Sequence, residues 1–194
     1  MSSGAKVRLH VARAWAEQIK ETLAPYCQRI EVGGSIRRRR DLVGDIDFIV
    51  EAADSAAFRA RAKKNGRVKR EGDRVLAVEL ANGAGLDFWF ARPAEKTLFE
   101  ETAGDWGIRL LVSTGSLTHN VALCQRATAM GLQFKPFEGI FDKATRIASE
   151  TEADVYEALG MPFLVPTSRS GRVVRQYALP GGTFLSMPAG LKHD

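Results

Sequence analysis

Two aspartates stand inside a short apolar run, and this pattern limits the possible folds more than any other feature of the chain. In residues 45–51 apolar side chains alternate with Asp45 and Asp47, which is the two-residue period of a β-strand. Such a strand buries one face and carries both carboxylates on the other. A third acid, Asp87, lies in the apolar run 85–90. An isolated acid there is costly to bury, so we expect the two strands to be neighbours.

The elements around these strands predict an α+β lobe with a small mixed sheet and covering helices. Apolar residues recur every four positions over 6–24, which indicates an amphipathic helix that Pro25 ends. Asp54 is placed to cap a second helix, and Asn82-Gly83 to turn a hairpin. The remaining strands are expected at 29–32 and 74–80.

After Arg92-Pro93 the sequence pattern changes to mainly helical signals, and it predicts a second, smaller α+β lobe. Three helices are expected there, one capped by Asp105, one capped by Ser116, and one opened by a capping box of Ser149 with Glu152. We place the boundary in the segment 92–104, which divides the chain into lobes 1–100 and 101–194. The tail after residue 169 is rich in turn residues and gives no clear element.

Composition favours a folded protein with a polyanionic partner. The hydrophobic share is 45 %, the formal charge is +5 and the pI is about 9.4. Charge alone fits a solvated surface equally well. Cys27 and Cys124 are far apart, which is typical of free thiols in a reducing compartment. Without a membrane span or signal peptide in the sequence, we expect a cytoplasmic protein, or a nuclear one in a eukaryote.

The paired carboxylates predict a metal site. Asp45 and Asp47 would repel each other unless a cation lay between them. Oxygen ligands suit Mg²⁺, which binds a few carboxylates together with waters and phosphate oxygens. An Asp-x-Asp pattern by itself is weak, because it is usually a solvent-facing strand edge. The preceding segment strengthens it.

That segment, 33–38, has the composition of a phosphate-binding loop. Gly34 permits close backbone approach, and the amides at the start of a helical turn attract phosphate oxygens. Ser35 adds a hydroxyl, Arg38 a guanidinium that can grip a phosphate, and Gly44 leaves room beside the acids. For the remaining arginines of this run we favour a basic surface.

These motifs, in order, resemble family X DNA polymerases of the nucleotidyltransferase superfamily. The string GGSIRRRRDLVGDIDFIV is similar to the family's glycine-serine loop and Asp-x-Asp strand, and LDFWF to the strand of its third aspartate. LLVSTGSLTHN resembles the segment that leads into the nucleotide-binding helix, and SETEADVYEALGMPFLVPTSR the closing helix. The resemblance implies a palm at 1–100 and a thumb at 101–194, and the short stretch before the loop suggests a minimal palm-plus-thumb form.

The resemblance also implies roles for individual residues. Asp45 and Asp47 would bind two Mg²⁺ ions, or Mn²⁺ as a substitute, and Asp87 the catalytic ion at the primer 3′-hydroxyl. The positions expected to bind the nucleotide are Gly34, Ser35, Arg38, Gly44, Gly115, Ser116 and Asn120. Of these, Gly115 and Ser116 would lie near the sugar, and Asn120 would touch the base from the minor-groove side.

Two departures from the family pattern affect substrate selection. Val112 and Ser113 stand where the family usually has an aromatic pair against the sugar 2′ position, so we expect weak rejection of ribonucleotides. Cys124 stands where an arginine often probes the template base. Arg126 and Gln125 are nearby candidates to replace it.

The sequence therefore predicts a monomeric DNA-directed DNA polymerase that adds dNTPs, and NTPs as a second option, to primer-template or gapped DNA, with short gap filling in repair. DNA would be held by scattered basic residues, including Arg169, Arg172 and Arg175. We interpret His119 as an exposed helix residue. The alternatives are transfer to a non-DNA acceptor (protein, RNA or small molecule), and an inactive nucleic-acid-binding protein.

Overall fold

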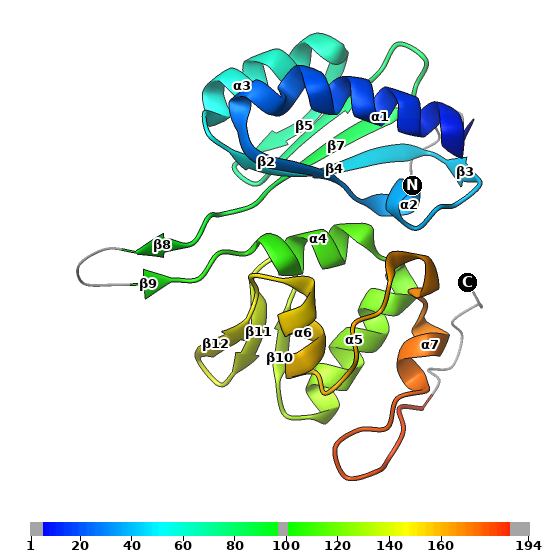
Figure 1. Ribbon diagram of the computed structural model, residues 1–194, viewed down its shortest axis with the longest axis vertical. Helices are drawn as coiled ribbons and strands as arrows, with labels where there is room; N and C mark the ends of the chain where they lie inside the picture. Colours follow the sequence, from blue (N-terminus) through cyan, green and yellow to red (C-terminus); the bar gives the residue numbers. More distant parts are fainter. Residues whose placement is uncertain (1–5, 97–100, 187–194) are drawn as a thin grey trace. The chain divides into compact units, whose positions relative to one another are not determined.

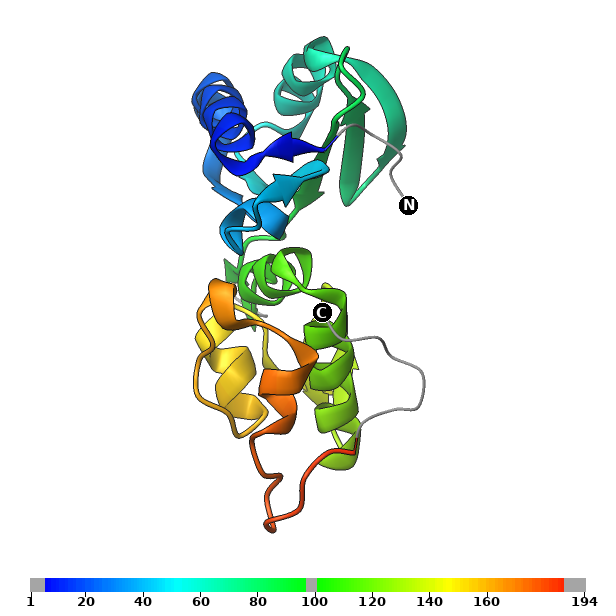
Figure 2. The ribbon, with the colours of Figure 1, turned by 90° about the vertical axis from the view of Figure 1, so that its right-hand side faces the viewer.

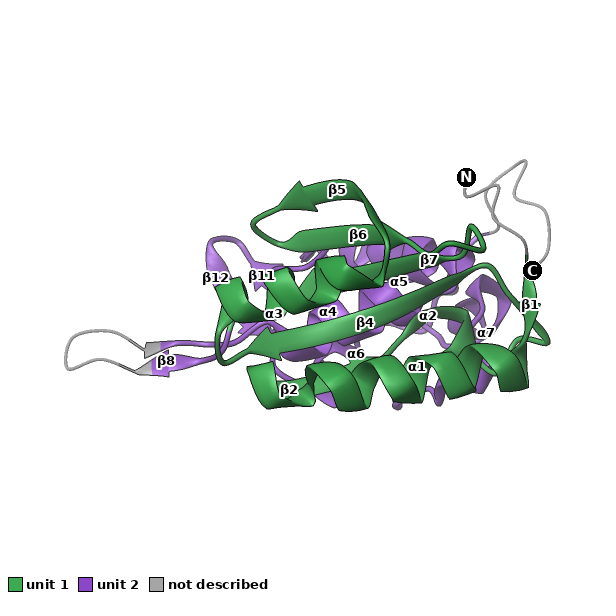
Figure 3. Ribbon diagram, turned by 90° about the horizontal axis from the view of Figure 1, so that it is seen from above, with its two compact units in different colours: residues 1–92 green, residues 93–194 purple. Residues whose placement is uncertain are grey.

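The computed structural model describes residues 6–96 and 101–186. The chain forms two compact units, residues 1–92 and residues 93–194 (Figure 3). Unit 1 carries the acidic strands, and unit 2 carries the segment expected to bind nucleotide. The α+β fold expected from the sequence is confirmed.

Unit 1 is built on a five-stranded mixed sheet with the order β2-β4-β7-β6-β5. In that order the strands are Cys27–Val32, Asp45–Ala52, Gly85–Phe90, Val75–Glu79 and Arg67–Gly72. Only β4 and β7 pair in parallel within this sheet, and the other neighbours are antiparallel. β6 and β7 form the expected hairpin, in which Gly83 has a φ of 83° that glycine adopts without strain.

Helices α1 (Leu9–Leu23) and α3 (Ser55–Ala62) cover one face of this sheet (Figures 1 and 2). Their apolar residues pack against alternate residues of β4 and β7, such as Phe48 and Phe88, whose rings stack with centroids 5.2 Å apart. Asp54 caps α3, because its carboxylate accepts from the Ala57 amide. The aspartates of β4 and β7 therefore point to the face that these helices leave uncovered.

Short elements complete unit 1. Strands β1 (Val7–Arg8) and β3 (Leu42–Val43) pair with each other, and α2 (Gly34–Arg37) is a single turn after β2. Two 3-10 turns follow α1 and α3 at Ala24–Tyr26 and Lys63–Asn65.

Unit 2 combines helices with a three-stranded antiparallel sheet, β10-β11-β12. Its helices are α4 (Trp106–Thr114), α5 (Leu117–Ala129), α6 (Glu152–Ala158) and α7 (Gly171–Arg175), with a 3-10 turn at Pro166–Ser168. Its strands are β10 (Gln133–Lys135), β11 (Gly139–Asp142) and β12 (Thr145–Ala148), and a separate pair joins β8 (Glu95–Lys96) to β9 (Glu101–Thr102). The core of unit 2 is formed by residues from α4, α5, α6, α7, the sheet and the segment that follows α6.

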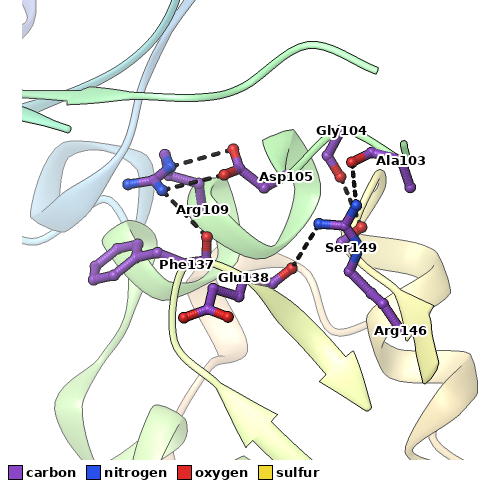
Figure 4. Close-up of polar contacts among 8 residues, drawn as sticks. All are labelled: Ala103, Gly104, Asp105, Arg109, Phe137, Glu138, Arg146 and Ser149. Carbon is purple, nitrogen blue, oxygen red and sulfur yellow. Dashed lines mark hydrogen bonds and ion pairs between the residues drawn. The ribbon is translucent and has the colours of Figure 1, made fainter. Parts of the chain in front are cut away.

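Two of the three helix caps expected in this half were wrong. Asp105 does not cap α4, because its carboxylate pairs with the Arg109 guanidinium, Nη2 to Oδ2 at 3.3 Å (Figure 4). Ser149 does not open α6, because its hydroxyl donates to the Gly104 carbonyl at 2.7 Å (Figure 4). The capping box is formed two residues later, by Thr151 and Asp154. Ser116 caps α5 as expected.

In the described part of the chain, no helix has the length and apolar character that crossing a membrane requires.

Candidate active site

Three half-buried aspartates lie on the uncovered face of the unit 1 sheet. Asp47 on β4 lies directly opposite Asp87 on β7, and Asp45 precedes Asp47 by two residues on the same face. The parallel pairing of β4 with β7 brings together two acids that are 40 residues apart in the sequence. The expected proximity of these acids is therefore a feature of the fold.

The Asp47 side chain is held by contacts on two sides. The indole Nε1 of Trp89 donates to Asp47 Oδ1 at 3.3 Å. On the other side, Gly34 lies so close that a Cβ added there would come within 2.0 Å of Asp47 Oδ2. Gly34 also has a φ of 57°, which glycine adopts without strain. This position therefore requires glycine both for the absence of a side chain and for its backbone conformation.

The electrostatics of the site favour protonation of two of these acids. Burial, together with the neighbouring Asp87 and Asp45 charges, raises the pKa of Asp47 to about 7, against the lowering effects of Trp89 and Arg38. Burial and Asp45 also raise the pKa of Asp87, while Arg70 lowers it. A cation among the three carboxyl groups would relieve both penalties. The donor set therefore suits a hard divalent ion.

The three aspartates do not form a complete metal-coordination site in this conformation. Among the described residues, no three acidic, histidine or cysteine side chains are close enough to hold an ion as they stand. The Asp45 carboxylate is turned toward Gly85, where an added Cβ would meet its Oδ1 at 2.6 Å. We infer that side-chain rotation of Asp45 would accompany metal binding, since Mg²⁺ needs its ligands at about 2.1 Å.

The expected phosphate-binding residues lie beside the acids. Gly34 and Ser35 belong to α2, and Arg38 follows this turn closely enough for its charge to lower the pKa of Asp47. Gly33 joins the loop to β4, because its amide donates to the Asp47 carbonyl at 2.8 Å. The space in front of Gly44 is open, with no atom within 4 Å of an added Cβ. An anion with bound cations therefore fits this face by charge and by space.

The expected nucleotide-binding residues of the second half lie together at the start of α5. Gly115 ends α4 with a φ of 71°, and it is joined to Ser116 by a cis peptide bond. The Ser116 hydroxyl accepts from the His119 amide. Asn120 is half-buried on the first turns of α5, where its Nδ2 donates to the Val112 carbonyl at 2.8 Å.

A groove of about 640 Å³ runs along α5 within unit 2, and Asn120 lines it. Its other walls are Val112, Leu117, Val121, Cys124, Gln125, Thr128, Ala129 and Pro136. Most of these side chains are apolar. The groove therefore offers packing to a flat, weakly polar group, together with a single well-held amide.

The structure excludes three of the roles considered for unit 2 residues. His119 is fully buried rather than exposed, and its ring bonds to Tyr156 and Asn120. Arg126 is fully buried and donates to four carbonyl oxygens, those of Leu159, Gly160, Tyr177 and Ala178, so it is no reader of a template base.

The third concerns Arg169, which is 2 % exposed and pairs with Glu152 at 2.6 Å, so it cannot lie on a DNA-binding surface. Arg172 is exposed, whereas Arg175 donates to Gln125 Oε1 at 2.9 Å.

Sequence reasoning missed two residues of the acidic face. Trp89 holds Asp47, and Arg70 on β5 lies with its guanidinium 5.5 Å from the Trp89 ring. Trp89 is two residues after Asp87, so the strand period already placed both on one face. Arg70 had no such signal, because β5 shows no apolar alternation.

Comparisons with known proteins agree with this geometry. Residues 109–170 match the family model described as DNA polymerase beta thumb. The structure is similar to the ternary P/T complex of Leishmania infantum polymerase beta, with a TM-score of 0.66 and 18 % identity, over 86 % of this chain and 77 % of that one. The fold is that of DNA polymerase beta. The resemblance to family X noted in the sequence is thus confirmed.

The ternary gap complex of the same Leishmania infantum enzyme gives a TM-score of 0.66 at 18 % identity, over 85 % of this chain and 71 % of that one. No curated protein sequence matches the chain. The polymerase beta thumb model covers most of unit 2, which includes α5 and its groove.

Proposed function

We propose that this protein is a DNA-directed DNA polymerase of family X type, which transfers nucleotides from dNTPs to a DNA 3′-hydroxyl. The observation that carries the proposal is the set of Asp45, Asp47 and Asp87 on two parallel strands, beside a glycine-serine turn. Burial and a neighbouring carboxylate raise the pKa of both Asp47 and Asp87 at this open face, which is typical of a site built for cations and phosphates. The polymerase beta fold supports nucleotidyl transfer as the reaction.

Different residues of unit 1 would bind the metal ions, bind the phosphates and orient the carboxylates in this reaction. Asp45 and Asp47 would hold two Mg²⁺ ions, and Asp87 would hold the one nearer the primer. When bound, these ions lower the pKa of the attacking hydroxyl and neutralise the triphosphate and the leaving pyrophosphate. Arg38 and the Ser35 hydroxyl donate to phosphate oxygens, and Trp89 keeps the Asp47 carboxylate oriented.

DNA as acceptor is supported by unit 2 and by charge. The thumb model matches a DNA polymerase, and the solved relatives are primer-template and gap complexes. The formal charge of +5 favours a polyanion. Since Arg169 is buried, binding rests on exposed basic residues such as Arg172, and it should weaken steeply with salt. Short gap filling is the activity that we propose for the protein in repair.

Incorporation of a single labelled dNTP into gapped DNA tests the proposal. Wild type with Mg²⁺ should extend the primer by one nucleotide, whereas EDTA or the pair Asp45→Ala and Asp47→Ala should abolish extension. Asp73→Ala, at an exposed turn of the same unit, serves as the matched control and should retain activity. Extension by the double variant would refute the assignment of these residues.

The same assay separates the alternatives. An inactive nucleic-acid-binding protein would bind gapped DNA without extending it under any metal. An enzyme with another acceptor would bind dNTP with Mg²⁺ and leave every DNA primer unextended. Either result would overturn the proposed function.

A further inference from the structure

The Asn120 side chain is held by a chain of hydrogen bonds that begins in the core of unit 2. Its Nδ2 lies 2.8 Å from the Val112 carbonyl oxygen, and its Oδ1 lies 3.0 Å from Nδ1 of His119. Nε2 of the same ring lies 2.8 Å from the Tyr156 hydroxyl. His119 and Tyr156 are fully buried, and only Asn120 reaches the groove. We name these three side chains the relay.

With a neutral His119 ring, the chemistry of the partners sets the direction of each bond in the relay. A backbone carbonyl can only accept, so the amide nitrogen of Asn120 must face Val112. The amide oxygen then faces His119, which fixes the ring proton on Nδ1. In the neutral ring Nε2 is left as an acceptor, so the Tyr156 hydroxyl donates to it. The neutral relay therefore has one proton arrangement, and the Val112 carbonyl excludes the flipped amide.

The fixed amide keeps one N–H and one oxygen lone pair for a partner in the groove. Within the described residues, no other side chain is recorded as bonding to it. Most neighbours in the groove are apolar, and Gln125 already accepts from Arg175. Asn120 is therefore the group that would orient a ligand in the groove. An amide that is already held in place loses less conformational entropy on binding than a free one.

We propose that His119 and Tyr156 are positioning residues, which hold the Asn120 amide so that its N–H meets an acceptor on the edge of a nucleobase in the groove. The inference rests on the proposed function. On the minor-groove side of DNA, the bases present acceptor atoms such as adenine N3 and thymine O2. Such an atom can accept the one N–H that Asn120 has left to donate. Neither positioning residue touches the nucleotide; both act through Asn120.

A double-mutant cycle on single-nucleotide insertion tests the proposal. Tyr156→Phe removes only the hydroxyl, so the KM for dNTP should rise about three- to tenfold, as expected for one lost hydrogen bond, while kcat changes less than about twofold. Asn120→Ala should raise the KM at least as much. Adding Tyr156→Phe to Asn120→Ala should then change the KM less than about twofold.

Tyr177→Phe is the matched control, because it removes the hydroxyl of another tyrosine that packs against the same core. It should leave both constants unchanged. A purely structural role would give a different result: Tyr156→Phe would lower kcat, or would act equally with and without Asn120. Either outcome overturns the proposal.

A second readout needs no substrate. In the free protein, the side-chain amide protons of Asn120, followed by ¹⁵N NMR, should exchange faster with solvent in Tyr156→Phe than in wild type or Tyr177→Phe. Equal exchange rates of the Asn120 amide protons in all three proteins would contradict the claim that the relay holds this side chain. If wild type does not extend DNA, the proposed function fails by itself, and the exchange measurement still decides whether the relay holds Asn120.

Discussion

Asp47→Asn should stabilise the metal-free protein while it abolishes activity. The raised pKa of Asp47 means that the folded state resists ionisation of this carboxyl group, whereas the unfolded chain ionises near the ordinary value of 3.8. Below pH 3.8 both states are protonated, and no stability is lost. Between pH 3.8 and about 7 the unfolded state releases its proton first, so stability falls as pH rises.

The expected size follows from the shift. From 3.8 to about 7 is roughly three pKa units, and each unit corresponds to about 1.4 kcal/mol. At pH 8 the ionised carboxyl group therefore costs the folded state up to about 4 kcal/mol. Asparagine is neutral, and its amide oxygen can still accept from Trp89, so the variant avoids this cost. About 3 kcal/mol of the difference should develop between pH 5 and pH 8.

Urea unfolding followed by circular dichroism measures this effect. In EDTA, the free energy of unfolding of Asp47→Asn should exceed that of wild type by more at pH 8 than at pH 5. Mg²⁺ should raise the stability of wild type and leave the variant nearly unchanged. Asp73→Asn, at an exposed turn, is the matched control and should follow wild type at both pH values. A pH-independent difference, or a less stable variant at pH 8, would refute the electrostatic reasoning.

Three further results are expected. Gly34→Ala should lose most of its incorporation activity and its Mg²⁺ binding, because the added Cβ would collide with the Asp47 carboxylate; isothermal titration with Mg²⁺ measures the second effect. Arg126→Gln should lower the free energy of unfolding by about 3 kcal/mol, since it leaves the buried Leu159 carbonyl and three partly buried carbonyl oxygens without their charged donor, and denaturant unfolding of the variant checks this. Ribonucleotides should be used well, because Val112 and Ser113 provide no aromatic barrier; restoring an aromatic pair at these positions should increase the deoxy-to-ribo ratio of kcat/KM, and an unchanged ratio contradicts the interpretation.

The acidic strands could be predicted because two signals coincided there, the alternation of apolar residues and the cost of burying an isolated acid. Alternation at Asp45 and Asp47 gave the strand and its face, and the same alternation at Asp87 gave a second strand. Their pairing followed from the cost of burying an isolated acid. Strand β5 (Arg67–Gly72) was missed, because all its residues are exposed and it has no buried face to produce an apolar period.

Unit 2 was harder to predict because its short elements and buried polar groups leave weak patterns. The strands β10 to β12 contain three or four residues each, too few to show a period. His119 and Arg126 carry polar side chains that usually indicate a solvent-facing helix position. Their burial depends on partners far along the chain, such as Tyr156, and sequence spacing alone does not show such partners.

The central claim is that Asp45, Asp47 and Asp87 together hold the metal ions of nucleotidyl transfer. The most direct test is a crystal structure of the protein with gapped DNA, a non-hydrolysable dNTP and Mn²⁺, because manganese is located by its anomalous scattering. We expect two anomalous peaks, both within coordination distance of Asp45 and Asp47 and one also at Asp87, with the triphosphate completing their ligands. Peaks elsewhere, with these carboxyl groups uncoordinated, would contradict the account.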